Sequence, residues 1–204
     1  MKQTAKEKKG YFGYVRHERK KRLLITLGLF ALPLVLFLTG YLTTHTTKNL
    51  FTMVAVVGCL PACKSLVGLI MVYIVKPMDA GDYGQIKQHT GDLLMSYELY
   101  ITSYDNSEFI CAAAVCGSYI IGYSDRLKNP SEMLEEQIRK LLAQNGYKQT
   151  VKIFKDIRPF LERLDSLNKN KESLESGLPF TPDPHYPDYD RNQMVRHVLL
   201  RLAL

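Results

Sequence analysis

The chain has 204 residues, which leaves room for one globular domain and an anchor. Its formal net charge of +7 arises in the first 22 residues, which hold nine lysines or arginines and two glutamates, whereas residues 76–204 hold 16 basic and 18 acidic residues. The basic isoelectric point is therefore no sign of a nucleic-acid-binding domain, and we expect no nucleic acid as a partner.

Two apolar segments follow the basic tail of residues 1–22. Residues 23–42 contain no charge, and residues 50–75 contain only Lys64. About 20 apolar residues cross a bilayer as a helix, and residues 43–49 form a short polar turn, so residues 23–75 are predicted to be a transmembrane helical hairpin. A cleaved signal peptide is the alternative, but its basic region would be long and no A-x-A site follows the apolar segment.

The orientation of this hairpin follows from the basic residues that flank it. The tail ends on Arg19, Lys20, Lys21 and Arg22, whereas the turn between the spans carries only Lys48. The positive-inside rule places the N-terminus in the cytoplasm, and two spans return the C-terminus to the same side. The lipid bilayer is the first expected partner, because basic residues near the surface attract anionic headgroups.

The second span contains two unusual residues. Pro61 is predicted to kink the helix, because it removes a backbone hydrogen bond. Lys64 has two interpretations: it lies near the cytoplasmic interface and extends its ammonium group to the headgroups, or it lies within the membrane and pairs with a partner. Neither span contains an acidic residue, so in the second case the carboxylate comes from another chain.

Residues 60–71 read L-P-A-C-K-S-L-V-G-L-I-M. This pattern, L-P-x-x-K-S-x-x-x-L-I-M, resembles the second span of small uncharacterised two-span membrane proteins of Gram-positive bacteria. The resemblance covers these residues and the general layout of the chain. It implies a location in the bacterial inner (plasma) membrane, and it supplies no activity.

Residues 76–168 are predicted to form a small cytoplasmic α+β domain. A polar connector with a short helix over residues 76–89 precedes two strand-like runs, residues 93–104 and 109–123, which are joined by turn residues 105–108. Gly117 suggests a bulge or a bend in the second run.

A helix is expected to start with Asn129 as its cap and to end at Asn145-Gly146. A strand over residues 150–154 and a helix capped by Asp156 follow. The resulting β-β-α-β-α order favours a small sheet with helices against one face, and it permits a crossover from the second strand through the helix to the third.

The remaining residues divide into a Pro-rich linker over residues 169–190 and an amphipathic C-terminal helix over residues 191–204. One face of that helix is apolar. Three surfaces could receive this face, namely the domain core, a partner or the membrane surface, and the domain itself is the default. The apolar face consists of Met194, Val195, Val198, Leu199 and Leu202.

Few residues suggest a catalytic, metal-binding or cofactor-binding site. Asp183, His185, Asp188 and Asp190 are candidate ligands of a divalent metal, but the prolines make this segment extended, so a solvated loop is the favoured interpretation and no metal site is expected. Cys111 and Cys116 are either nucleophiles or small buried packing residues. The strand order loosely allows a restriction-endonuclease-like core, but residues 109–123 contain no charged side chain where an E-x-K-type pair would lie. No cofactor motif occurs, so no cofactor is expected.

Three functions remain open on these observations. The first is a membrane-anchored module that binds a protein partner or a second copy of the chain, with tyrosines and the C-terminal helix as contact elements. The second is a membrane-surface enzyme of unrecognised type, and the third is an accessory subunit that uses Lys64. These tyrosines could equally brace the domain against the lipid headgroup layer. They are Tyr83, Tyr97, Tyr100, Tyr104, Tyr119, Tyr123 and Tyr147.

Overall fold

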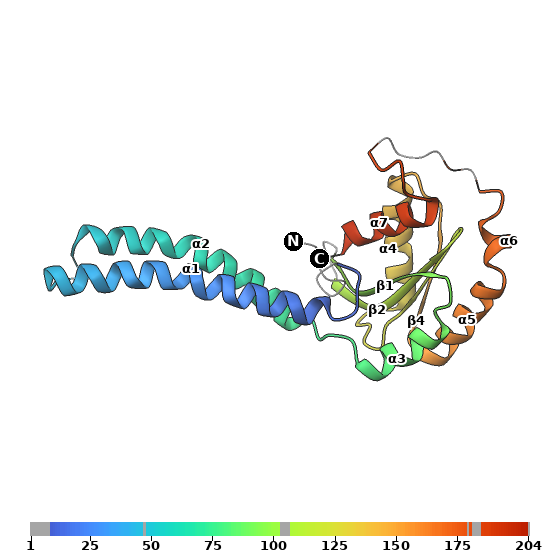
Figure 1. The fold of residues 1–204 in the computed structure, drawn as a ribbon, viewed down its shortest axis with the longest axis horizontal. Coiled ribbons are helices and arrows are strands. Elements are labelled where there is room, and N and C mark those ends of the chain that lie inside the picture. The colour runs from blue at the N-terminus through green and yellow to red at the C-terminus, as the bar shows by residue number, and fades with distance from the viewer. Residues whose placement is uncertain (1–8, 47, 103–106, 179, 181–184, 204) are drawn as a thin grey trace. The chain divides into compact units, whose positions relative to one another are not determined.

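The computed structural model describes residues 9–46, 48–102, 107–178, 180 and 185–203. Two compact units are present, Val15–Lys76 and the described part of Met1–Tyr14 together with Pro77–Leu204. The first unit consists of two long apolar helices, and the second is a small mixed four-stranded sheet with helices (Figure 1). The α+β class and the two N-terminal helices are therefore confirmed.

The two N-terminal helices are α1 (Tyr14–Thr44) and α2 (Leu50–Ile74). Each is long and apolar enough to cross a membrane, and only 17% of the most apolar window of each is buried. Neither helix is therefore buried as a core helix within this chain, since a core helix buries most of its apolar surface. Asn49 begins α2, because its side-chain oxygen accepts a hydrogen bond from the N–H of Thr52 at 2.8 Å.

Small residues at intervals of seven form the seam between these two helices. On α1 the buried seam residues are Thr26, Pro33 and Gly40, and on α2 they include Ala55 and Ala62. Small side chains allow two helix backbones to approach closely inside a membrane. The hydroxyl oxygens of Thr26 and Ser65 lie 2.8 Å apart and fix the register of the antiparallel pair.

The sheet contains β1 (Leu94–Thr102), β2 (Ser107–Cys116), β3 (Tyr119–Tyr123) and β4 (Thr150–Phe154) in that spatial order. The first two pairings are antiparallel, and β3 pairs with β4 in parallel. The parallel pairing agrees with the expected crossover through a helix.

The expectation of a single strand-like run over residues 109–123 is wrong. Gly117 has a φ of 57°, and with Ser118 it forms a tight turn after which Tyr119 pairs with Cys116. A glycine reaches this left-handed conformation without strain, which allows a two-residue hairpin instead of a bulge. The order is therefore β-β-β-α-β-α. Of the predicted turn, residues 105–106 lie outside the described residues, and Ser107 and Glu108 belong to β2.

The expectation of helices on one face of the sheet is also wrong. On one face, α4 (Ser131–Gln144) packs on β4, and α7 (Arg191–Leu202) packs on β1 and β2. On the other face lies α5 (Ile157–Lys169), against β3 and beside α3 (Ala80–His89), as Figure 1 shows. Nine of the ten residues of β2 are buried, and burial of a strand on both faces explains its continuous apolar run.

Helix α4 begins differently from the expectation. Pro130 is the N-cap, and no side chain caps the helix. The Asn129 side chain instead donates to the carboxylate of Glu108 at 2.7 Å, because that buried carboxylate needs donors from the loop before α4. The end of the helix at Asn145, with Gly146 at a φ of 85°, is as predicted.

The C-terminal helix α7 docks on the domain. Asp190 and Gln193 form a reciprocal capping box at its start, and Met194, Val195, Val198 and Leu199 are buried. Its apolar face therefore belongs to the core and is not a contact surface for a partner. A short helix, α6 (Lys171–Glu175), lies within residues 169–190.

Candidate functional site beside the last helix

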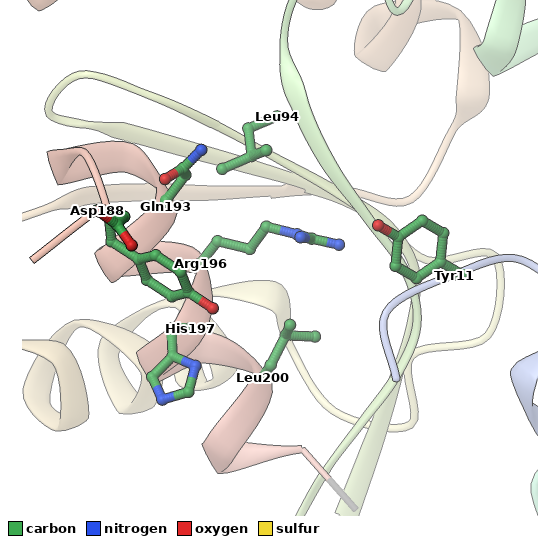
Figure 2. Close-up of a pocket in the computed structure, with 8 residues that line it drawn as sticks. Tyr11, Leu94, Asp188, Gln193, Arg196, His197 and Leu200 are labelled. Carbon is green, nitrogen blue, oxygen red and sulfur yellow. The ribbon is translucent and has the colours of Figure 1, made fainter. Parts of the chain in front are cut away.

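A groove of about 460 Å³ runs along α7, and we call it the α7 groove (Figure 2). It combines a cation, aromatic rings and aliphatic side chains from three distant parts of the chain. Its lining residues are Tyr11, Leu94, Asp188, Tyr189, Gln193, Arg196, His197 and Leu200.

Helix α7 supplies the centre of the groove. Because Val195 and Leu199 are fully buried against the sheet, Arg196 and Leu200, one position further along in each case, lie at the border between core and surface. Figure 2 shows the Arg196 side chain crossing the middle of the groove toward Tyr11, with Leu94 on one side and Leu200 on the other.

The guanidinium group of Arg196 is held by two contacts. Its Nε donates a hydrogen bond to the hydroxyl of the fully buried Ser96 at 2.9 Å. Its Cζ lies 5.4 Å from the centre of the Tyr11 ring, within the range of a cation–π interaction. These contacts fix the direction in which the planar guanidinium presents its donors.

Tyr11 reaches the groove because the residues around it are tied to the domain. The N–H of Tyr97 donates to the carbonyl of Gly10 at 2.9 Å, and Phe12 stacks on Tyr83 with ring centres 4.0 Å apart. Gly10 is required there, since its φ is 84° and a Cβ would lie 2.6 Å from a methyl carbon of Leu200.

The same segment has one further attachment. The ammonium of Lys9 donates to the carbonyl of Ala203, and partial burial lowers the pKa of Lys9 below its usual value.

A cluster of rings forms the other end of the groove. The rings of Tyr186 and Tyr189 stack 5.3 Å apart, and His197 lies 4.7 Å from Tyr186 and 5.9 Å from Tyr189. Tyr189 remains 38% exposed and Tyr11 37% exposed, so the groove offers accessible aromatic surface at both ends. Arginine and tyrosine are enriched at protein interfaces, where they supply both contact area and hydrogen bonds.

The predicted metal ligands are not brought together. Asp188 lines the α7 groove, whereas the carboxylate of Asp190 caps α7 by accepting the N–H of Gln193 at 2.7 Å. His185 is exposed, and Asp183 lies outside the described residues. Among the residues that the structure describes, no group of three or more histidines, cysteines or carboxylates could hold a metal ion.

The two cysteines of the sheet are buried thiols. Burial raises the pKa of Cys111 to about 12 and that of Cys116 to about 11. The Sγ of Cys111 donates to Asp125 at 3.1 Å. A nucleophilic cysteine needs a lowered pKa and access to solvent, so this geometry favours the packing interpretation.

The basic residues before the first apolar segment fall into two groups. Arg19 donates to the carbonyls of Val72, Tyr73 and Val75 and thereby satisfies backbone groups that the end of α2 leaves without helical partners. Its guanidinium also lies 5.2 Å from the centre of the Tyr73 ring.

Arg22 also contacts α2, since it donates to the carbonyl of Gly68 at 3.0 Å, and it forms an ion pair within α1 with Glu18 at 2.9 Å. Lys20 and Lys21, in contrast, are exposed. The sequence alone did not distinguish these four basic residues. The contacts between α1 and α2 show that the two arginines bind α2 while the two lysines remain exposed.

Lys64 and Pro61 are both exposed on α2, which continues through Pro61 as one helix. Lys64 directly precedes Ser65, the partner of Thr26, and it lies four residues before Gly68, the partner of Arg22. Four residues correspond to about 6 Å along a helix axis.

Sequence reasoning missed the α7 groove, because its three contributing segments are separated by more than 80 residues in each case. The paired tyrosines around residues 186–189 and the charged residues of the last helix were the only available signals. In comparisons with protein-family models, curated proteins and solved structures, no match to this chain was found.

Proposed function

We propose that this chain is a two-span protein of the bacterial plasma membrane with both termini in the cytoplasm, and that its α+β domain is a protein-interaction module. One observation carries the membrane insertion in this proposal. The outer surface of the α1–α2 hairpin is covered by exposed large apolar side chains, including Leu24, Leu32, Val56 and Leu60. A continuous surface of this kind is favourable in lipid and costly in water.

The distribution of arginines supports the same orientation. Arg19 donates hydrogen bonds to carbonyl groups at the C-terminal end of α2, and Arg22 donates to Gly68 in the same half of that helix. The exposed Lys20 and Lys21 can then meet anionic headgroups. The positive-inside rule assigns that end to the cytoplasm.

Lys64 fits this placement without a partner carboxylate. Its distance of about 6 Å from the level of Gly68 is within the reach of an extended lysine side chain, which keeps its ammonium in the headgroup layer while its stem lies along apolar surface. The accessory-subunit hypothesis therefore receives less support than the snorkelling interpretation.

Insertion and orientation are tested together in cells. In a cysteine-free background, we expect Lys48→Cys, in the turn between the helices, to react with a membrane-impermeant maleimide added to intact cells. Ser173→Cys, on α6, should react only after lysis, and both variants should stay in the membrane pellet after alkaline carbonate extraction. Release by carbonate would exclude insertion, and labelling of only Ser173→Cys in intact cells would reverse the orientation.

The α7 groove is the proposed contact surface of the domain. It offers a positioned guanidinium and exposed tyrosine rings, and among the described residues that line it none has the nucleophile and base arrangement of an enzyme of the common hydrolytic types. A recognition role therefore accounts for these residues better than catalysis does.

Site-specific photo-cross-linking tests this role in the full chain. A photoreactive residue at Tyr189, in the groove, should give a cross-linked product of defined mass in cells. The same residue at Met133, exposed on α4, is the matched control and should not give that product. Products shared by both positions, or the absence of any product from Tyr189, would exclude the groove as the contact surface.

A further inference from the structure

We infer that the α7 groove recognises a carboxylate of its partner that is flanked by apolar side chains, such as an acidic residue between two aliphatic ones. This inference rests on the proposed function and names the chemical class of the partner segment. Three features of the groove support it: a fixed cation, apolar surfaces on both sides of that cation, and an acidic residue at the opposite end.

The fixed cation is Arg196. Its Nε donates to the hydroxyl of Ser96, and its Cζ lies 5.4 Å from the centre of the Tyr11 ring, so the side chain is ordered before any partner arrives. A guanidinium pairs with a carboxylate through parallel hydrogen bonds. An arginine that is already ordered loses little side-chain entropy when it binds.

The apolar surfaces are Leu94 and Leu200. Both are partly buried, and Leu200 packs against the domain core, so neither side chain moves freely. Figure 2 shows them on opposite sides of Arg196. A complementary segment therefore places its carboxylate at the guanidinium and an aliphatic side chain on each leucine.

The acidic residue is Asp188. It lies on the far side of the groove from Tyr11 in Figure 2, and it lines the groove together with Tyr189 and His197. A second carboxylate at that end would be repelled. The groove therefore discriminates against uniformly acidic segments, and it favours a single acidic residue in an otherwise apolar or basic context.

Selection from a random heptapeptide library displayed on phage tests this specificity. The full chain in lipid nanodiscs is the bait, with Arg201→Gln as the matched control, since Arg201 is exposed on the same helix and does not line the groove. We expect wild type and Arg201→Gln to enrich peptides with one Asp or Glu between aliphatic residues. A synthetic peptide of that consensus should bind Arg196→Gln about tenfold or more weakly, because a charge-assisted hydrogen-bonded pair is lost.

Two further measurements separate the loss of the guanidinium contact from a loss of charge alone or from unfolding. Arg196→Lys retains the charge without the planar fork and should bind with intermediate affinity, while the near-ultraviolet circular dichroism of each variant reports whether the domain is folded. A consensus without an acidic residue, or equal binding of its Gln counterpart, overturns the inference but leaves the photo-cross-linking result intact. Binding of phosphatidylglycerol vesicles that depends on Arg196, with no peptide enriched, would overturn it in favour of a lipid headgroup.

Discussion

Buried glutamates in the domain are each held by backbone N–H groups. Glu98 accepts from Met78 at 3.2 Å, Glu108 from Lys128 and Asn129, and Glu135 from Ile153 at 2.9 Å. Each of these carboxylates ties a loop or a strand edge to the sheet or to α4. Hydrogen bonds of this kind offset the cost of burying a charged group.

Replacement of Glu108 should therefore destabilise the domain. Three N–H groups face this carboxylate: one oxygen accepts from the Lys128 N–H, and the other accepts from the backbone and side chain of Asn129. Glu108→Gln keeps one acceptor oxygen but places an amide donor against the N–H groups at the other oxygen position. We expect a loss of about 2–4 kcal/mol in the free energy of unfolding, measured by denaturant titration of the full chain in detergent. Glu162→Gln, at an exposed position of α5, is the control and should change stability by less than about 0.5 kcal/mol.

The buried Cys111 thiol predicts how the free energy of unfolding changes with pH. Burial raises the pKa of Cys111 from 9.0 to about 12, so the folded state keeps a proton that the unfolded state releases at lower pH. The stability contributed by the neutral thiol is present below pH 9 and is lost as the pH rises from 9 toward 12. Cys111→Ala should therefore show a flatter decline of the free energy of unfolding over that interval than wild type, and an equal decline would contradict the assignment.

At the scale of elements, α7 completes the core instead of projecting from it. Val195 and Leu199 are fully buried, and Ala203, just after the helix, forms an antiparallel bridge to Ile101 of β1. At the same edge of the sheet, the carbonyl of Gly10 accepts the N–H of Tyr97. Segments from both ends of the chain thus cover part of an edge strand that would otherwise be open to pairing with another molecule.

Deletion of α7 would therefore unfold the domain and could not serve as a test of partner binding. Leu199→Ala should lower the free energy of unfolding by about 2–5 kcal/mol, the usual cost of emptying a leucine site in a packed core. Met133→Ala, on the exposed face of α4, is the matched control and should cost far less. Equal effects in denaturant titrations of the two variants would show that α7 does not contribute to the core.

The helical hairpin depends on its small seam residues. The double variant Thr26→Cys with Ser65→Cys, with Cys59 and Cys63 replaced by serine, should form an intramolecular disulfide under mild oxidation, because the native hydroxyl oxygens lie 2.8 Å apart. Adding Ala62→Leu should lower the yield, since Ala62 is fully buried in the seam. Adding Val57→Leu, at an exposed position of the same helix, should leave it unchanged, and equal losses from both would argue against this seam.

The whole molecule combines an apolar hairpin with a folded α+β domain. A substitution at Lys64 tests whether the hairpin pairs with another chain. Under the snorkelling interpretation, Lys64→Leu should leave the oligomeric state in detergent unchanged, because no partner carboxylate is lost. Light scattering of wild type, Lys64→Leu and the control Lys48→Leu measures this. Dissociation of a complex in the Lys64 variant alone would instead show that this lysine pairs with another chain.

Sequence patterns defined most of the elements. The apolar runs predicted α1 and α2, a short strand was predicted at the residues of β4, and helical periodicity predicted α4, α5 and α7. They failed at Gly117, where one strand-like run is two strands, and at Asn129, whose side chain binds Glu108 instead of capping α4. The first failure concerns a tight turn, because a single glycine in an apolar run is compatible with a bulge, a bend or a turn. The second concerns a contact between residues that are 21 positions apart, for which local propensity carries no information.

The sequence by itself determined the apolar hairpin, the α+β class and the basic tail, because hydrophobicity, periodicity and charge are properties of neighbouring residues. Only the tertiary structure decided that helices cover both faces of the sheet and that Tyr11, Leu94 and Arg196 line one groove. It alone also separated Arg19 and Arg22, which bind carbonyls of α2, from the exposed Lys20 and Lys21. These features arise from packing between distant segments, and the geometry of that packing is not written in any local pattern.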